Sequence, residues 1–127
     1  MPVTIVNTPN APAPIGPYSQ AVRAGDTVYV SGVIGLDPKT GQLVEGGVAA
    51  QAERVFASLA AIASAAGGSL ANAVKLTIYL TDLADFAAVN EQMTHAFHTP
   101  FPARATVGVK ELPRGAAVEV DAVLHLE

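Results

Sequence analysis

Arg104 is the residue whose chemistry places the strongest demand on the rest of this chain. It lies in the mostly apolar segment FPARATVGV at positions 101–109, a pattern that is typical of a strand. Only seven residues of the chain are Lys or Arg, and burying an unpaired guanidinium costs several kcal/mol. Arg104 is therefore either half of a structural ion pair or a planar two-donor group that binds a carboxylate or a phosphate.

Glu119 is an acid between two valines in a segment that predicts the last strand. Positions 118, 120, 122 and 124 form an apolar face, so Glu119 and Asp121 share the polar face. One interpretation is a cross-strand salt bridge of Arg104 with Glu119 or Asp121. The other is a site in which Arg104 holds an anion while Glu119 positions a water molecule. In a plain hairpin Glu119 would fall near Gly108 rather than opposite Arg104, but the sequence does not set the register, and both interpretations stay open.

Tyr18 is a third candidate for chemistry, because it follows a tight bend. Gly16 and Pro17 impose this bend, which presents Tyr18 at the mouth of the first expected hairpin. A phenol in such a place can donate a hydrogen bond while its ring shields a site from water. Simple packing of the ring is the alternative.

Three further polar or small residues are candidates for the wall of a pocket. Ser31 and Gly32 end the third expected strand, where glycine allows a close approach of the backbone. Asn90 lies four residues after Phe86 and hence near the buried stripe of the second expected helix. Asn90 could instead cap or cross-link loops, and a Ser-Gly pair alone is weak evidence.

The elements that must position these residues follow from the spacing of apolar residues. Alternation and helical periodicity predict the order β-β-β-α-β-α-β-β. The first helix is expected over 48–66, and the second follows a cap at Thr81 or Asp82, with its stripe ending at Phe97. This order predicts an α+β fold in which two helices pack on one face of a mixed six-stranded sheet. Residues 1–127 are expected to form a single domain. Two apolar stripes are expected to be buried: Val74, Leu76, Ile78 and Leu80 of the fourth strand, and Leu83, Phe86, Val89 or Asn90, Met93 and Phe97 of the second helix.

Composition limits the classes of function. Half of the residues are hydrophobic and 14% are charged, well below the usual ~25%, so part of the surface is expected to be covered by another chain. The net charge is −4 and the cations are scattered, so no nucleic-acid surface is expected. The chain has no Cys, which excludes disulfides, thiol nucleophiles and thiolate metal sites.

Metal and membrane chemistry are not expected either. His95 and His98 are spaced as two ligands at a helix end, but no third ligand is evident, and solvated surface histidines are the favoured interpretation. The first residues lack the basic region and apolar run of a signal peptide. The longest uncharged apolar stretch, at 55–66, is too short to span a bilayer. A cytoplasmic protein is the expectation.

Five segments together resemble the RidA/YjgF family of reactive intermediate imine deaminases, over residues 7–126. Each segment is modest alone, and the resemblance depends on their order and spacing. The segments are IGPY at 15–18, VSG at 30–32, TDL with DFAAVN at 81–90, FPAR at 101–104, and LP with VEV at 112–120.

The resemblance implies a chorismate-mutase-like α+β fold that assembles as a homotrimer, with a central barrel of three sheets and sites in clefts between subunits. It implies hydrolysis of 2-imino acids, such as 2-iminobutanoate and 2-iminopropanoate, to 2-keto acids and ammonia. No cofactor is implied, because imine hydrolysis needs orientation and proton transfer but no metal or redox group.

The resemblance also implies roles for single residues. Arg104 would bind the substrate carboxylate and Glu119 would order the attacking water. One departure concerns Thr106, which stands where the archetypal deaminases carry Cys and which bears on pocket shape and substrate preference. The residues implied to line the pocket are Tyr18, Ser31, Gly32, Asn90, Arg104 and Thr106.

Two other classes of function remain as alternatives. A non-catalytic module that binds a keto or amino acid would need the same Arg104 clamp, so no sequence feature separates it from an enzyme. A ribonuclease or translation inhibitor, a function claimed for some relatives, is disfavoured by the scattered cations and the acidic total charge.

Overall fold

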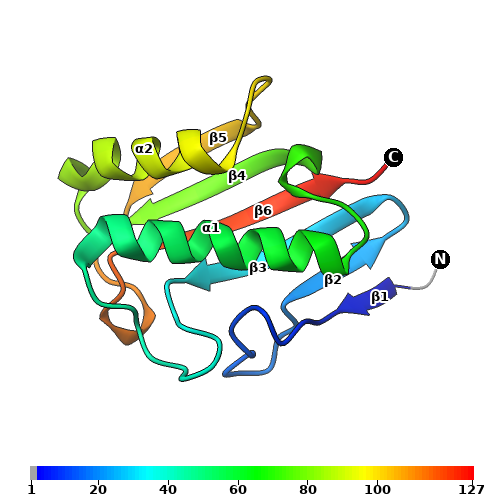
Figure 1. Cartoon of the computed structure of the whole chain (residues 1–127), viewed down its shortest axis with the longest axis horizontal. Helices are drawn as coiled ribbons and strands as arrows, with labels where there is room; N and C mark the ends of the chain where they lie inside the picture. Colours follow the sequence, from blue (N-terminus) through cyan, green and yellow to red (C-terminus); the bar gives the residue numbers. More distant parts are fainter. Residues whose placement is uncertain (1–2) are drawn as a thin grey trace.

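A six-stranded mixed sheet with two helices on one face forms the protein (Figure 1). The computed structural model describes residues 3–127. The sheet has the order β1-β2-β3-β6-β4-β5, in which only the β4–β5 pair is parallel. The predicted α+β class and order of elements are confirmed. The strands are β1 (Val3–Val6), β2 (Ala21–Ala24), β3 (Thr27–Ile34), β4 (Ala73–Leu80), β5 (Ala103–Gly108) and β6 (Val118–His125), and the helices are α1 (Gly47–Ala65) and α2 (Phe86–Ala96), with short 3-10 turns η1 (Leu70–Asn72), η2 (Leu83–Asp85) and η3 (Pro113–Gly115).

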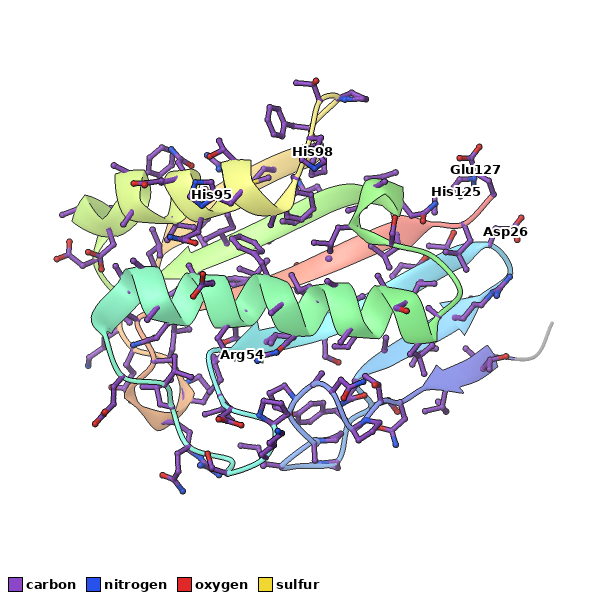
Figure 2. All side chains as sticks on the ribbon, in the orientation of Figure 1. Asp26, Arg54, His95, His98, His125 and Glu127 are labelled. Carbon is purple, nitrogen blue, oxygen red and sulfur yellow. The ribbon has the colours of Figure 1, made fainter. Side chains whose placement is uncertain are left out.

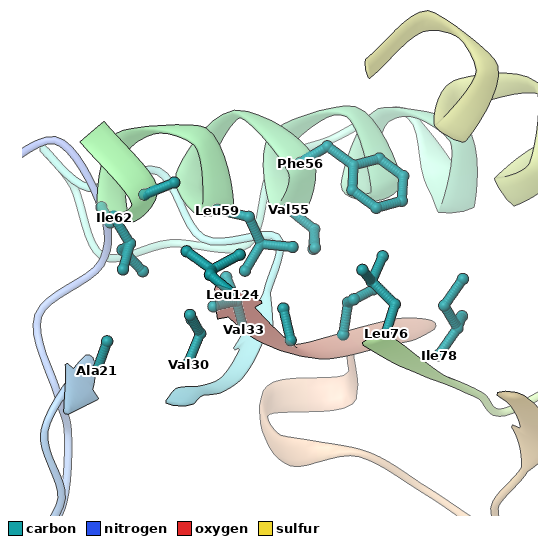
Figure 3. Packing of buried hydrophobic residues seen from close by; sticks show 14 of the residues in the cluster. Ala21, Val30, Val33, Val55, Phe56, Leu59, Ile62, Leu76, Ile78 and Leu124 are labelled. Carbon is teal, nitrogen blue, oxygen red and sulfur yellow. The ribbon is translucent and has the colours of Figure 1, made fainter. Parts of the chain in front are cut away.

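The core lies between the helices and the sheet. Val55, Leu59 and Ile62 recur on one face of α1 and are buried against the sheet. Figure 3 shows these side chains above Leu76 and Leu124 of the central strands. Burial of each such side chain stabilises the fold by about 1.5–3 kcal/mol. Because the apolar side chains of β4 and β6 alternate along the chain, they lie on one face of each strand, and their burial turns that face toward the helices.

Three apolar residues that were expected to be buried are exposed instead. The β4–β6 register shifts between Ala73 and Lys75, and this bulge removes Val74 from the alternation, leaving it 48% exposed. Leu83 is 55% exposed and Phe86 is 41% exposed. Leu83 precedes α2, and Phe86 is its first residue.

A 3-10 turn before α2 explains why Leu83 is exposed. The Asp82 side chain accepts a hydrogen bond from the Ala84 N–H and caps η2, so α2 begins only at Phe86. Leu83 therefore lies outside the stripe of α2, whose buried members are Val89 and Met93.

The opposite face of the sheet carries no covering element among residues 3–127. Both helices lie on the same side (Figure 1). Tyr29 of β3 and Ile5 of β1 lie on the uncovered face and are more than half exposed, and Val107 of β5 is 39% exposed there. A sheet face with apolar side chains ordinarily packs against another layer.

No helix within residues 3–127 combines the length and the apolar character that crossing a bilayer requires.

Candidate active site

Arg104 is held on β5 by three side chains of α2. Its Nη1 donates a hydrogen bond to Asn90 Oδ1 at 2.6 Å and a weaker one to Met93 Sδ at 3.4 Å. Its Cζ lies 5.1 Å from the centre of the Phe86 ring, within the range of a cation–π interaction. A guanidinium has five N–H donors, and Nη1 alone donates to a partner among residues 3–127. The helix thus orients Arg104 and leaves the other donors available for an anion.

These contacts border a pocket between α2 and the start of β5, called here the Arg104 pocket. It has a volume of about 410 Å³, which is sufficient for a small carboxylic acid. Its lining residues are Asn90, Met93, Thr94, Phe101, Pro102 and Arg104.

A second pocket, called here the Glu119 pocket, surrounds Glu119 at the junction of β3, β6 and two loops. Its volume is about 350 Å³. The structure brings together four residues that the sequence proposed for a site, Tyr18, Ser31, Gly32 and Glu119. The full lining is Ile15, Tyr18, Ser31, Gly32, Ile34, Pro113 and Glu119.

A bulge in β3 shapes the Glu119 pocket. The register of β3 against β6 shifts between Val30 and Val33, so Ser31 and Gly32 leave the regular ladder. The Ser31 hydroxyl donates a 2.6 Å hydrogen bond to the Ser19 carbonyl oxygen, which joins the loop that carries Tyr18 to the strand. A Cβ at Gly32 would collide with the Glu119 carboxylate in its present position, so glycine here lets the carboxylate lie close to the β3 backbone.

The Glu119 carboxyl has no cationic partner within residues 3–127, where the ion pair found is Arg23–Asp26 at 3.8 Å. Burial, and secondarily the negative charge of Asp121, raise the pKa of Glu119 above its ordinary value. A partly buried acid with a raised pKa and an open pocket is suited to exchange protons with water.

Arg104 and Glu119 lie on opposite faces of the sheet. Arg104 pairs with Leu76 of β4, which is buried beneath the helices. Glu119 alternates with Val118 and Val120, which are buried on that same helix-covered face, so its side chain emerges on the uncovered face. Within one copy of the chain, the two residues cannot contact the same small molecule.

This arrangement excludes the cross-strand salt bridge within a single copy. β5 pairs with β4 in parallel, and β6 lies between β3 and β4, so β5 and β6 form no hairpin. Asp121 lies on the same sheet face as Glu119, so it forms no ion pair with Arg104 within one copy either. The charge of Arg104 is balanced in this chain by solvent, an amide oxygen and an aromatic face.

Thr106 lies on the same strand face as Arg104 but lines neither pocket. Its Oγ1 is buried and has no hydrogen-bond partner among residues 3–127.

His95 and His98 are both exposed, and Figure 2 shows them at the end of α2 and just beyond it. In the described part of the chain, no group of three or more His, Cys, Asp or Glu side chains could hold a metal ion.

Sequence reasoning missed Phe86 and Met93 as contacts of Arg104, since it assigned both to the buried stripe. The spacing of Phe86 and Asn90, one helical turn apart, was the available signal. It also missed Ile34 and Pro113, whose place in the Glu119 pocket depends on the pairing of distant segments.

Comparison with known proteins identifies relatives over almost the whole chain. A family model described as endoribonuclease L-PSP matches residues 8–126. The 2-iminobutanoate/2-iminopropanoate deaminase of Dermatophagoides farinae is 44% identical, and the match covers 99% of this chain and 98% of that protein.

Solved structures agree with this match. RidA from an Antarctic Psychrobacter species is 50% identical with a TM-score of 0.94, covering 97% of this chain and 99% of that one. The crystal structure of E. coli TdcF with bound serine is 36% identical with a TM-score of 0.93, covering 98% of this chain and 99% of that one. On the shared sequence, the shared sheet and helices, and the matched family model, this chain belongs to the RidA/YjgF family.

Proposed function

We propose that this protein is a hydrolytic deaminase that converts 2-imino acids, such as 2-iminobutanoate and 2-iminopropanoate, to 2-keto acids and ammonia. The observation that carries the proposal is the pair of complementary pockets: one presents free guanidinium donors of Arg104, and the other presents the unpaired, partly buried acid Glu119. The 44% identity to a relative named for this reaction supports it.

The proposed site is completed between copies of the chain, with the Arg104 pocket of one copy facing the Glu119 pocket of the next. The opposite orientation of the two residues supports this arrangement, as does the exposure of Tyr29 and Val107 on the uncovered sheet face. A homotrimer is the proposed assembly. Sedimentation at micromolar concentration should then give about three times the monomer mass, and a stable monomer would contradict both the assembly and the shared site.

In the proposed mechanism, Arg104 binds the substrate carboxylate through two parallel N–H donors, which fixes the position of C2. Glu119 accepts a proton from water as the water oxygen bonds to C2, and this proton passes to the imine nitrogen. The hydroxyl of the resulting carbinolamine then transfers its proton to nitrogen, the C–N bond breaks, and ammonia leaves as the C=O bond forms. One water is consumed, and one 2-keto acid and one ammonia are released.

The other residues of the two pockets have supporting roles in this proposal. Asn90 holds the guanidinium in place, while Tyr18, Ser31 and Gly32 bound the side where the water lies. Thr106 is proposed to affect the shape of the site through its position on the same strand face as Arg104, because its buried hydroxyl lines neither pocket.

A coupled assay tests the proposal directly. An amino-acid oxidase or threonine dehydratase generates the imine, semicarbazide intercepts it, and the protein should suppress semicarbazone formation in proportion to its concentration. Unchanged semicarbazone formation at equimolar protein would contradict a deaminase.

Binding without turnover is the second candidate, and the bound serine in E. coli TdcF favours it. In that case calorimetry would detect serine or a 2-keto acid at the Arg104 pocket, while the coupled assay would show no loss of semicarbazone.

A third candidate function is that of a ribonuclease, which the description of the matched family model as an endoribonuclease favours. The Arg104 pocket has a single cation and the chain has a net charge of −4. We therefore expect no RNA binding that weakens steeply with salt, and a salt titration with RNA in the same preparation checks this.

A further inference from the structure

Two residues next to Glu119, Tyr79 and Asp121, line neither pocket. Glu119 and Asp121 are two positions apart on β6, so they share the uncovered face at a spacing of about 7 Å along the strand. Tyr79 of β4 stands opposite Glu119 in the register, yet its hydroxyl donates a 2.9 Å hydrogen bond to Asp121 Oδ2. Tyr79 therefore crosses diagonally from the position of Glu119 to the carboxylate of Asp121.

Acids and phenols surround Glu119, and within residues 3–127 no cation lies within ion-pair distance of its carboxylate. Arg114, next to Pro113 of the pocket wall, donates a hydrogen bond to the Gly41 carbonyl oxygen instead. The cation of β4 on this face, Lys75, is paired with Val123, four residues along the strand from Tyr79. β3 contributes no titratable group to the Glu119 pocket. The titratable groups that face Glu119 are Asp121 from β6, Tyr79 from β4 and Tyr18 from the loop before β2.

We propose that Tyr79 and Asp121 are positioning residues, in which the Tyr79 hydroxyl fixes the Asp121 carboxylate beside Glu119 and the fixed negative charge makes Glu119 a stronger base. The catalytic meaning of this inference rests on the proposed deaminase function. The effect of the Tyr79–Asp121 pair on the proton affinity of Glu119 does not depend on that function.

The electrostatics of the three groups agree with this arrangement. The hydrogen bond to Asp121 is the main reason why the pKa of Tyr79 lies above its ordinary value, so the phenol remains a donor at neutral pH. Burial and the charge of Asp121 raise the pKa of Glu119. A base whose pKa lies closer to the working pH accepts a proton from water more readily.

The test is a titration of the Glu119 carboxyl by carbon-13 NMR on the assembled protein, with the signal assigned by its loss in Glu119→Gln. In Asp121→Asn the midpoint should fall by about half a pH unit or more, because a like charge is removed. In Tyr79→Phe it should fall by less, because Asp121 keeps its charge but loses its fixed position.

A double variant separates positioning from a direct effect of the phenol. If Tyr79 acts through Asp121, the variant carrying both Tyr79→Phe and Asp121→Asn should titrate like Asp121→Asn alone. Tyr29→Phe is the matched control, since Tyr29 lies on the same sheet face and makes no side-chain hydrogen bond within residues 3–127; it should leave Glu119 unchanged.

Kinetics give a second readout. The acidic limb of the pH profile of kcat/KM for imine hydrolysis should move down in pH by the same amount as the NMR midpoint. An unmoved Glu119 midpoint in Asp121→Asn would overturn the inference, as would an effect of Tyr79→Phe that persists without Asp121. Absence of imine hydrolysis with the expected NMR shifts would overturn the proposed function alone.

Discussion

The Arg104 pocket and the Glu119 pocket are built in different ways. Arg104 is held by a helix, through an amide, a thioether and an aromatic ring, on the covered face of the sheet. Glu119 lies on the uncovered face beside a strand bulge and two loops, without a cation. The first pocket suits recognition of a fixed anion and the second suits proton transfer. Substitutions should therefore separate ligand binding from turnover.

Arg104→Lys should have the largest effect. Lys keeps the charge but lacks the planar two-donor fork, so imine hydrolysis should fall by ~10²–10⁴-fold, or roughly 3–5 kcal/mol of transition-state stabilisation. Binding of 2-keto acids, measured by calorimetry, should weaken in parallel, while folding and assembly stay normal. Hydrolysis of 2-iminobutanoate at the parental rate would show that Arg104 is not the clamp.

Glu119→Gln should reduce turnover by ~10²-fold or more, as expected for loss of a general base, while 2-keto acids still bind. This split between kcat and ligand affinity is what distinguishes Glu119 from Arg104. Loss of both folding and ligand affinity would instead make Glu119 a structural residue.

The same variant has an expected effect on stability. A raised folded-state pKa means that the native protein favours protonated Glu119, so its contribution to stability is present at low pH and is lost as pH rises through the folded pKa. Glu119→Gln removes this loss. Its Tm should be at least that of the parent at pH 7, and the difference should shrink as the pH falls toward the ordinary pKa of a glutamate.

Phe86→Leu tests the recognition pocket more gently. It removes the ring beneath the guanidinium, an interaction of about 0.5–1 kcal/mol at an exposed site, so 2-keto acid affinity should fall about two- to fivefold. Leu83→Ala is the matched control, because Leu83 is a similarly exposed apolar residue just before α2, whereas the Phe86 ring lies under the Arg104 guanidinium.

Thr106→Cys should have the smallest effect. Water is the proposed nucleophile and the swap is close in volume, so activity should stay within about tenfold of the parent. A thousandfold gain in turnover would mean that the native chain is a poor deaminase and would favour the binding module.

Local patterns were sufficient to predict most of the fold. The alternation at 118–124 and the stripe of α1 correctly identified the buried faces of these elements, because side-chain periodicity is set by the backbone itself. The prediction that Val74 and Leu83 are buried was wrong. A bulge in β4 and a 3-10 turn before α2 shift the phase of the pattern without a clear apolar signal in the sequence.

The relation between Arg104 and Glu119 was beyond the reach of local pattern. It depends on β6 lying between β3 and β4 while β5 pairs with β4 at the edge. Long-range strand pairing sets this order, so the sequence identified both residues as candidates but left their register open.

Subunit complementation tests the central claim, that one site takes Arg104 from one copy and Glu119 from another. Arg104→Lys and Glu119→Gln chains, co-expressed with different tags and purified as mixed trimers, should regain about a third of the parental activity, because a mixed trimer of either composition joins an intact Arg104 to an intact Glu119 at one of its three interfaces. Mixed assemblies, verified by native mass spectrometry, that remain as inactive as the separate variants would contradict a site shared between copies.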